Sequence, residues 1–306
     1  MSSTDIERPG FRPEATRGGA RRRKHRKSPI RRRVASNGWN LLGLLLAAIL
    51  IFPVYWMVTS AFKPENEINA LNPTFLPSHP TLSHFDNAIH RPYFWADVKN
   101  TLIIVLVTVA ISMFVAFFAA VALAKFRFTG RKLFIVLMIG IQMLPTVGLI
   151  IPLYIVLAKF HQTNALMGVT VTYITTVLPF SVWTLRGFII GIPRDLEEAA
   201  MVDGNSRLGA FVRILLPLVA PGLVATSIFA FVVSWNEFIF ANTLLQSQSK
   251  QTITVWLSYF YGLTTGPTPW GDLMAASTLT ALPVMLFFII IQRKIAFGLT
   301  AGAVKA

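Results

Sequence analysis

The sequence predicts an all-α membrane protein with six membrane-spanning helices. Of its 306 residues, 54% are hydrophobic and only 13% are charged, and the mean hydropathy is +0.59, which is above the usual value for a water-soluble domain of this length. The apolar residues fall into six stretches, each close to the ~20 residues that cross a bilayer as a helix. These observations exclude a water-soluble globular enzyme.

The six apolar stretches give the expected order of elements along the chain. They lie at residues 41–61, 101–124, 133–157, 166–185, 219–241 and 273–292. Residues 1–40 are instead rich in Arg, Pro, Gly and Ser, and such a composition cannot bury enough apolar surface to fold. We therefore expect a disordered basic tail ahead of one six-span domain at 41–306. The first stretch exceeds the roughly 7 to 15 apolar residues of a secretory signal peptide, which favours an uncleaved first helix.

Proline occurs in several of the expected spans. Pro53 lies in the first, Pro145 and Pro152 in the third, Pro179 in the fourth and Pro283 in the sixth. Each removes one backbone N–H donor and bends its helix. Bent helices leave gaps that suit a pathway through the membrane, although membrane helices generally tolerate proline without such a role.

The distribution of positive charge predicts the orientation of the spans. Six spans place the tail and the segments 125–132, 186–217 and 293–306 on the same side of the membrane. Of the 28 Lys and Arg residues, 12 lie in the tail and 11 in these three segments, while the other 5 lie on the opposite side. Because Lys and Arg concentrate in cytoplasmic segments, we expect a multi-pass protein of the cell membrane with both termini in the cytoplasm. The tail is then expected to contact membrane lipid, and the net charge of +15 needs no nucleic-acid partner.

The sequence offers few groups for catalysis or metal binding. It contains no cysteine, which excludes disulfides, thiol nucleophiles and cysteine-ligated metals. His79, His84 and His90 share one external loop, but their spacings of five and six do not align on a helix face, and no carboxylate pattern completes a metal site. The chain also has no phosphate-binding GxxxxGK(S/T) loop. We expect no enzyme, no metal site and no cofactor.

The most informative segment is the cytoplasmic stretch 192–217, IPRDLEEAAMVDGNSRLGAFVRILLP, here called the elbow. Pro193 can start a first helix, and the acidic residues that follow it favour the positive N-terminal end. Gly204 can adopt the left-handed conformation that ends this helix. Asn205 or Ser206 can cap a second helix, so that the segment forms two helical arms.

The second arm of the elbow carries an apolar stripe. Phe211, Ile214 and Leu215 lie at spacings of three and four, as on one helix face. Pro217 is expected to end this arm before the fifth span. Small side chains and acidic residues meet at the bend between the arms, which would let another protein approach the backbone closely. The elbow is therefore either a docking surface or a short amphipathic helix lying on the membrane.

The elbow also contains a specific motif. Glu198-Ala199-Ala200 is followed after three residues by Gly204, and after nine more by Ile214 and Leu216-Pro217. This pattern resembles the EAA motif of the permease subunits of bacterial ABC importers, at the cytoplasmic position that the family requires. Three other segments are similar to the shorter sugar permease of the maltose type: residues 77–89 (PSHPTLSHFDNAI), Trp235-Asn236-Glu237-Phe238, and residues 298–305 (GLTAGAVK).

The resemblance implies a type I ABC importer permease fold and a set of partners. The chain would pair with a homologous second permease and with two ATP-binding subunits, and it would receive an oligosaccharide from an extracytoplasmic sugar-binding protein. The elbow would couple to an ATP-binding subunit through five residues, Glu198, Ala199, Ala200, Asp203 and Gly204. A permease for another solute, such as a polyol or a peptide, shares the EAA motif and stays open. A secondary transporter would instead be expected to show charges in mid-membrane or an inverted repeat, and neither is seen.

Trp235, Asn236 and Glu237 form a candidate substrate site late in the fifth stretch. An aromatic face stacks on a sugar ring, and amide and carboxylate groups hydrogen-bond sugar hydroxyls. These three residues could thus line the outer mouth of a sugar pathway. A structural or gating contact of Glu237 is the competing explanation.

Tyr259, Phe260 and Tyr261 form a second candidate group in the long external segment 242–272. Their glycine-rich setting favours side chains that reach outward. The resemblance implies that the binding protein docks on this segment, while an aromatic belt at the membrane surface is the alternative.

Overall fold

The computed structural model describes the backbone of residues 29–260 and 268–302 and the side chains of residues 39–260 and 268–291. Every regular element in these ranges is helical, so the predicted all-α class is confirmed. The chain divides into two compact units, residues 1–53 and 54–306.

The first unit holds most of helix α1 (Pro29–Ala61). Its part Trp39–Ala61 is long and apolar enough to cross a membrane, and Pro53 lies inside it without ending it. The helix starts before residue 40, where we expected the disordered tail to end. Residues 1–28, the rest of that tail, lie outside the described residues.

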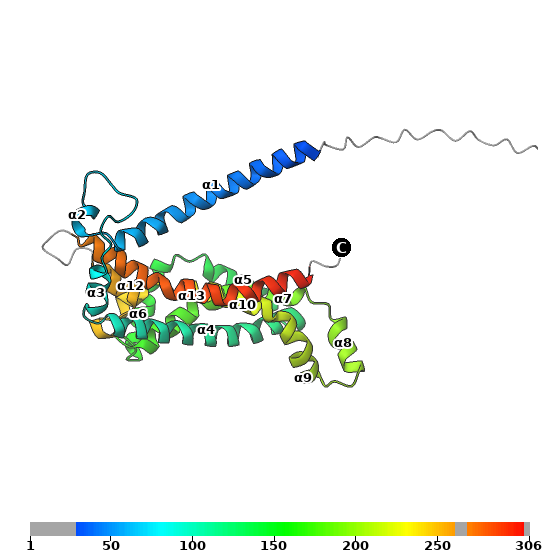
Figure 1. Cartoon of the computed structure of the whole chain (residues 1–306). Coiled ribbons are helices and arrows are strands. Elements are labelled where there is room, and N and C mark those ends of the chain that lie inside the picture. Colours follow the sequence, from blue (N-terminus) through cyan, green and yellow to red (C-terminus); the bar gives the residue numbers. More distant parts are fainter. Residues whose placement is uncertain (1–28, 261–267, 303–306) are drawn as a thin grey trace, which may run out of the picture. The chain divides into compact units, whose positions relative to one another are not determined.

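The second unit is built on four long apolar helices: α4 (Phe94–Lys125), α7 (Leu166–Ile190), α10 (Leu216–Trp235) and α13 (Trp270–Gly302). Helix α4 packs against α7 and α10, and α10 packs against α13 (Figure 1). Ala116 and Ala120 of α4 are fully buried beside Leu185 of α7 and Val219 of α10. Their small side chains let the helices approach closely, as is usual in membrane bundles.

The expected third span, residues 133–157, is not one continuous helix. Helix α5 (Arg131–Gln142) is followed by the 3-10 turn η1 (Thr146–Leu149) and helix α6 (Ile150–Lys159), and the two halves are bent by 101°. Pro145 explains the break, because proline removes a donor and keeps the residue before it out of the helical region. The described residues thus contain five candidate spans, or six if this pair counts as one.

The prediction that Pro217 separates the elbow from the fifth span is wrong. Helix α8 (Asp195–Val202) forms the first arm of the elbow. The second arm consists of α9 (Arg207–Ala210) and the π-helical turn η2 (Phe211–Leu215), and it continues directly into α10. Pro217 lies in the first turn of α10, where a missing N–H costs little. The span then ends at Trp235, earlier than expected, and α11 (Ile239–Leu244) is a separate short helix.

The external connections fold over one end of the bundle, which we call the outer end. It comprises α2 (Glu65–Ile68), α3 (Ser83–His90), the 3-10 turn η3 (Gln248–Lys250) and α12 (Ile253–Ser258). Figure 1 shows α3 and α12 at the end of the bundle opposite α8 and α9. This arrangement agrees with the assignment of elbow and external loops to opposite sides of the membrane.

Buried His84 connects three parts of the outer end. Its Nδ1 lies 2.7 Å from Asp272 Oδ1, in the first turn of α13, and its Nε2 lies 3.0 Å from the carbonyl oxygen of Lys63. The backbone of Gly271 is so close that an added Cβ would lie 2.2 Å from the imidazole ring. The histidine therefore holds the start of α13 against α3 and the segment after α1.

Candidate functional site

The first arm of the elbow ends as the sequence predicts. Gly204 has a φ of +90°, and the backbone N–H groups of Gly204 and Asn205 donate to the carbonyl oxygens of Met201 and Ala200 at 3.1 and 3.0 Å. These two bonds make the Schellman motif that closes many helices with glycine. No atom of the described residues lies within 4 Å of a Cβ built on Gly204. The bend is thus fixed by backbone conformation and open to a partner.

The second arm starts at Ser206, one of the two caps that the sequence allowed. Its Oγ accepts a hydrogen bond from the Gly209 N–H at 3.0 Å. The other candidate, Asn205, accepts from Arg213 Nη1 at 3.0 Å and so joins the bend to the arm. The predicted apolar stripe packs inward: the Phe211 ring lies 5.5 Å from that of Phe117 in α4. The apolar stripe of the second arm therefore packs against the bundle, while Leu208 and Val212 on its other side are exposed.

The first arm is tied by charge to the C-terminal end of α4. Lys125 Nζ lies 2.6 Å from Glu197 Oε1, and Arg194 Nη2 donates to the carbonyl oxygen of Lys125 at 2.8 Å. The angles of the first contact do not meet hydrogen-bond geometry, so it counts as an ion pair. Sequence reasoning missed this connection because its partners lie about seventy residues apart and belong to no local pattern.

The five predicted coupling residues lie around the bend. Ala200 is buried, whereas the other four are exposed: Glu198, Ala199, Asp203 and Gly204. Val202 and Leu208, on either side of the bend, are 87% and 71% exposed. An exposed surface with an apolar centre and acidic neighbours is suited to contact with another protein.

The side chains of Trp235, Asn236 and Glu237 make contacts within their own part of the chain. The Trp235 indole is 3% exposed and stacks on Phe231 at 5.6 Å, and the Asn236 amide donates to the Val232 carbonyl oxygen at 2.8 Å. The Glu237 carboxylate accepts from the backbone N–H groups of Phe240 and Ala241 at 2.8 and 3.2 Å. Glu237 thus stabilises the start of α11, which corresponds to the structural contact that was the alternative to a role in the sugar pathway.

Tyr259 and Phe260 do not reach outward as expected. Phe260 is 1% exposed, with its ring 5.1 Å from Trp256 and the Arg91 guanidinium 4.0 Å above it. The Tyr259 hydroxyl accepts from Gln251 Nε2 at 2.7 Å. Tyr261 lies outside the described residues. The described part of this group supports the folded outer end from within, a packing role that the glycine-rich sequence did not indicate.

A cavity of about 420 Å³ lies beside the break of the third span, where α5, η1, α6, α7 and α10 meet. Its lining includes Gln142, Thr175, Thr176, Phe180 and Phe229. The two phenylalanine rings are 3.9 Å apart. Both threonine hydroxyls donate to backbone carbonyl groups of α7, so their oxygens remain available as acceptors. The cavity therefore combines aromatic faces with hydrogen-bonding groups, and it opens on the surface of the subunit, since Gln142, Thr175 and Phe229 are exposed.

The comparisons with known proteins agree on one family. A family model described as "Binding-protein-dependent transport system inner membrane component" matches residues 110–300. The chain is 42% identical to the diacetylchitobiose uptake system permease protein DasC of Streptomyces coelicolor, over 87% of this chain and 96% of that protein. It is 34% identical to the trehalose/maltose transport system permease protein MalG of Thermococcus litoralis, over 86% and 94%.

A solved structure supports the architecture. The crystal structure of a bacterial ABC transporter involved in the import of the acidic polysaccharide alginate contains a chain similar to this one, with a TM-score of 0.73. The similarity covers 87% of this chain and 98% of that chain at 20% identity. At this identity the likeness concerns the fold alone.

Proposed function

Since the chain belongs to the family of inner-membrane components of binding-protein-dependent transport systems, we propose that it is the permease subunit through which an ABC importer conducts a neutral oligosaccharide. The observation that carries the sugar assignment is the 42% identity, over nearly the whole chain, to a permease named for diacetylchitobiose uptake. A disaccharide of N-acetylated or plain hexose units is the substrate class.

The elbow is the proposed contact with a separate ATP-binding subunit. Its bend is exposed and backbone-defined at Gly204, while its two arms are held to α4 by the Lys125–Glu197 pair and by Phe211. A partner that moves the bend would therefore move α4. A second permease would complete the pathway wall, and a sugar-binding protein would meet the outer end; both termini would lie in the cytoplasm.

The cavity at the third-span break is the proposed sugar pathway inside this subunit. Phe180 and Phe229 offer ring faces for the apolar side of a sugar, and Gln142, Thr175 and Thr176 offer groups for its hydroxyls. This site replaces Trp235 as the stacking surface, because the Trp235 ring is already buried against Phe231.

Uptake measurements in a strain that lacks this gene test the proposal. Complementation with the wild type should restore uptake of radiolabelled diacetylchitobiose, trehalose or maltose. Phe229→Ala should lower that uptake at an unchanged amount of subunit in the membrane. Phe288→Ala, an exposed position on α13 that does not line the cavity, is the matched control. Gene-dependent uptake of a polyol or a peptide, with no gene-dependent uptake of any of the three sugars, would overturn the sugar assignment.

A further inference from the structure

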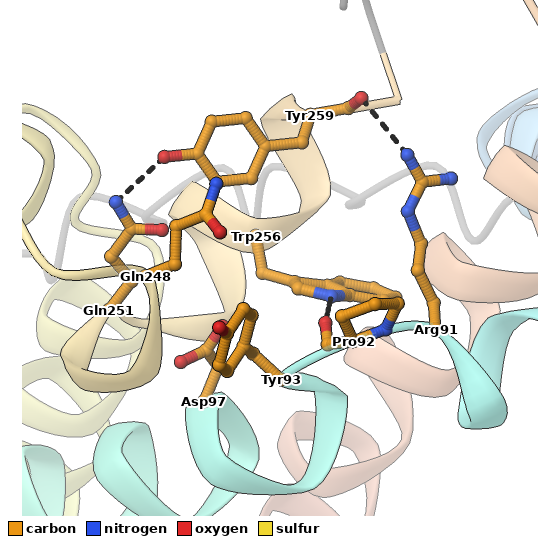
Figure 2. Close-up of a pocket in the computed structure, with 8 residues that line it drawn as sticks. All are labelled: Arg91, Pro92, Tyr93, Asp97, Gln248, Gln251, Trp256 and Tyr259. Carbon is orange, nitrogen blue, oxygen red and sulfur yellow. Dashed lines mark hydrogen bonds between the residues drawn. The ribbon is translucent and has the colours of Figure 1, made fainter.

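A second cavity, of about 190 Å³, lies in the folded outer end. It is formed by the segment between α3 and α4, the first turn of α4, η3 and α12. Figure 2 shows its eight lining residues, with Trp256 and Tyr259 facing Tyr93 and Asp97 across a common space. The full lining is Arg91, Pro92, Tyr93, Asp97, Gln248, Gln251, Trp256 and Tyr259.

This cavity is distinguished by buried side-chain oxygens that accept no hydrogen bond from the described residues. Asp97 is 1% exposed, and neither of its carboxylate oxygens has a hydrogen-bond partner among the described residues. The nearby Asn100 amide directs its N–H groups to the carbonyl oxygens of Ser249 and Gln251, at 3.1 Å each. Gln251 Oε1 is also without a partner within the described part of the chain. Buried acceptors are normally satisfied, so three in one place indicate a missing donor-rich ligand.

The walls determine what kind of donor fits. The Trp256 indole is already enclosed: its N–H donates to the Pro92 carbonyl oxygen at 3.0 Å, and its ring lies 5.1 Å from the rings of Phe94 and Phe260. The accessible aromatic wall is Tyr93, which is 46% exposed. Arg91 lines the same cavity as Asp97, so positive and negative charge balance there. A neutral ligand with several hydroxyl groups and an apolar ring face matches these walls better than a free ion does.

We propose that this cavity binds one sugar unit, whose hydroxyl groups donate to Asp97 and Gln251 while its apolar face packs on Tyr93. The volume is below the roughly 300 to 1,000 Å³ of pockets for larger ligands, so it holds the end of an oligosaccharide. The site is separate from the cavity at the third-span break and lies on the outer side of it. The assignment of a sugar rests on the proposed function; the existence of a donor-rich ligand rests on the unpaired acceptors alone.

A protection experiment tests the site in the assembled transporter without its binding protein. The native chain has no cysteine, so Gln248→Cys places one thiol at the cavity rim. Its reaction with an impermeant maleimide is timed with and without diacetylchitobiose, trehalose and maltose. The sugar that the transporter imports should slow labelling about elevenfold at roughly ten times its Kd. Gln246→Cys is the matched control, because this exposed residue lies two positions earlier and does not line the cavity.

Asp97→Asn in the Gln248→Cys background keeps the shape and removes the charge. It should abolish protection, while an unchanged labelling rate without sugar shows that the outer end is still folded. Loss of protection in a Tyr93→Ala variant with intact basal labelling would support the same site independently.

Three results would overturn the inference. Equal protection at Gln246→Cys and Gln248→Cys would place the effect of the sugar elsewhere. Protection by sodium chloride or spermidine, but by no sugar, would make this a cation site. Absence of protection with a sugar that the same complex imports would leave the proposed function standing and remove this site, whereas failure of import itself would be seen in the uptake assay.

Discussion

Gly204 offers the sharpest test of coupling through the elbow. Its φ of +90° is a conformation that side-chain-bearing residues adopt at a cost of about 1 to 2 kcal/mol. A Cβ at this position meets no atom of the described residues within 4 Å. A substitution therefore acts in two ways only: through backbone strain within the chain, and through collision with whatever binds the bend.

Gly130 separates these two effects. It has nearly the same φ, +89°, and equally open surroundings, but it precedes α5 and not the elbow. Gly130→Val and Gly204→Val thus impose similar strain, worth a factor of about 5 to 30 in a conformational equilibrium. Gly204→Asn relieves much of that strain, because asparagine tolerates the left-handed region, yet it still adds bulk at the proposed contact.

The assay compares uptake, ATP hydrolysis and co-purification of the ATP-binding subunit at matched membrane levels. Coupling through the bend predicts that Gly204→Val and Gly204→Asn both lose uptake and co-purification, while Gly130→Val keeps them. If Gly204→Asn behaves like the wild type and both valine variants fail alike, strain alone explains the loss. Wild-type activity of both Gly204 variants would refute the elbow as the coupling surface.

Three further predictions concern orientation, the outer end and the tie to α4. Val202→Cys should resist an impermeant maleimide in intact cells while Gln246→Cys reacts; labelling of Val202→Cys would reverse the predicted topology. Gly271→Ala forces a Cβ to within 2.2 Å of the His84 ring, so the purified complex should lose about 1 to 3 kcal/mol of stability and melt at a lower temperature. An unchanged melting curve would contradict the packing described. Lys125→Ala leaves the buried carboxylate oxygen of Glu197 without its partner, so the subunit should lose stability. At matched membrane levels the variant should also lower sugar uptake per ATP hydrolysed; an unaltered ratio would show that the pair carries no coupling.

Local rules predicted the elbow well. Gly204 and Ser206 terminate and cap helices through contacts with residues three to five positions away, so sequence spacing contains the needed information. The EAA motif lies in the same segment, and the family resemblance that it predicted is confirmed. The fold class and the assignment as a transport subunit, not an enzyme, are confirmed with it.

Long-range contacts account for what the sequence did not predict. Pro145 indicated a bend, but the 101° angle depends on how α5 and α6 pack against other helices. The glycine-rich setting of Phe260 predicted a side chain that reaches outward. The ring is instead buried, because Arg91, distant in sequence, and Trp256 of α12 pack against it. Asp97 lies in the first turn of α4, and residues that share its cavity come from η3 and α12, about 150 positions later in the chain.

Helix α4 joins the features on which the proposed function depends. Its 32 residues span about 48 Å at 1.5 Å per residue, enough to cross the bilayer core and extend beyond it. Its C-terminal end holds the first arm of the elbow through Lys125, and its first turn contributes Asp97 to the cavity in the outer end. Between them, Ala116 and Ala120 are fully buried in one cluster with residues of α7 and α10, and close packing of this kind transmits a displacement imposed at the elbow. A single rigid helix thus connects the proposed ATPase contact to the proposed sugar site, and the Lys125→Ala variant tests whether movement passes along it.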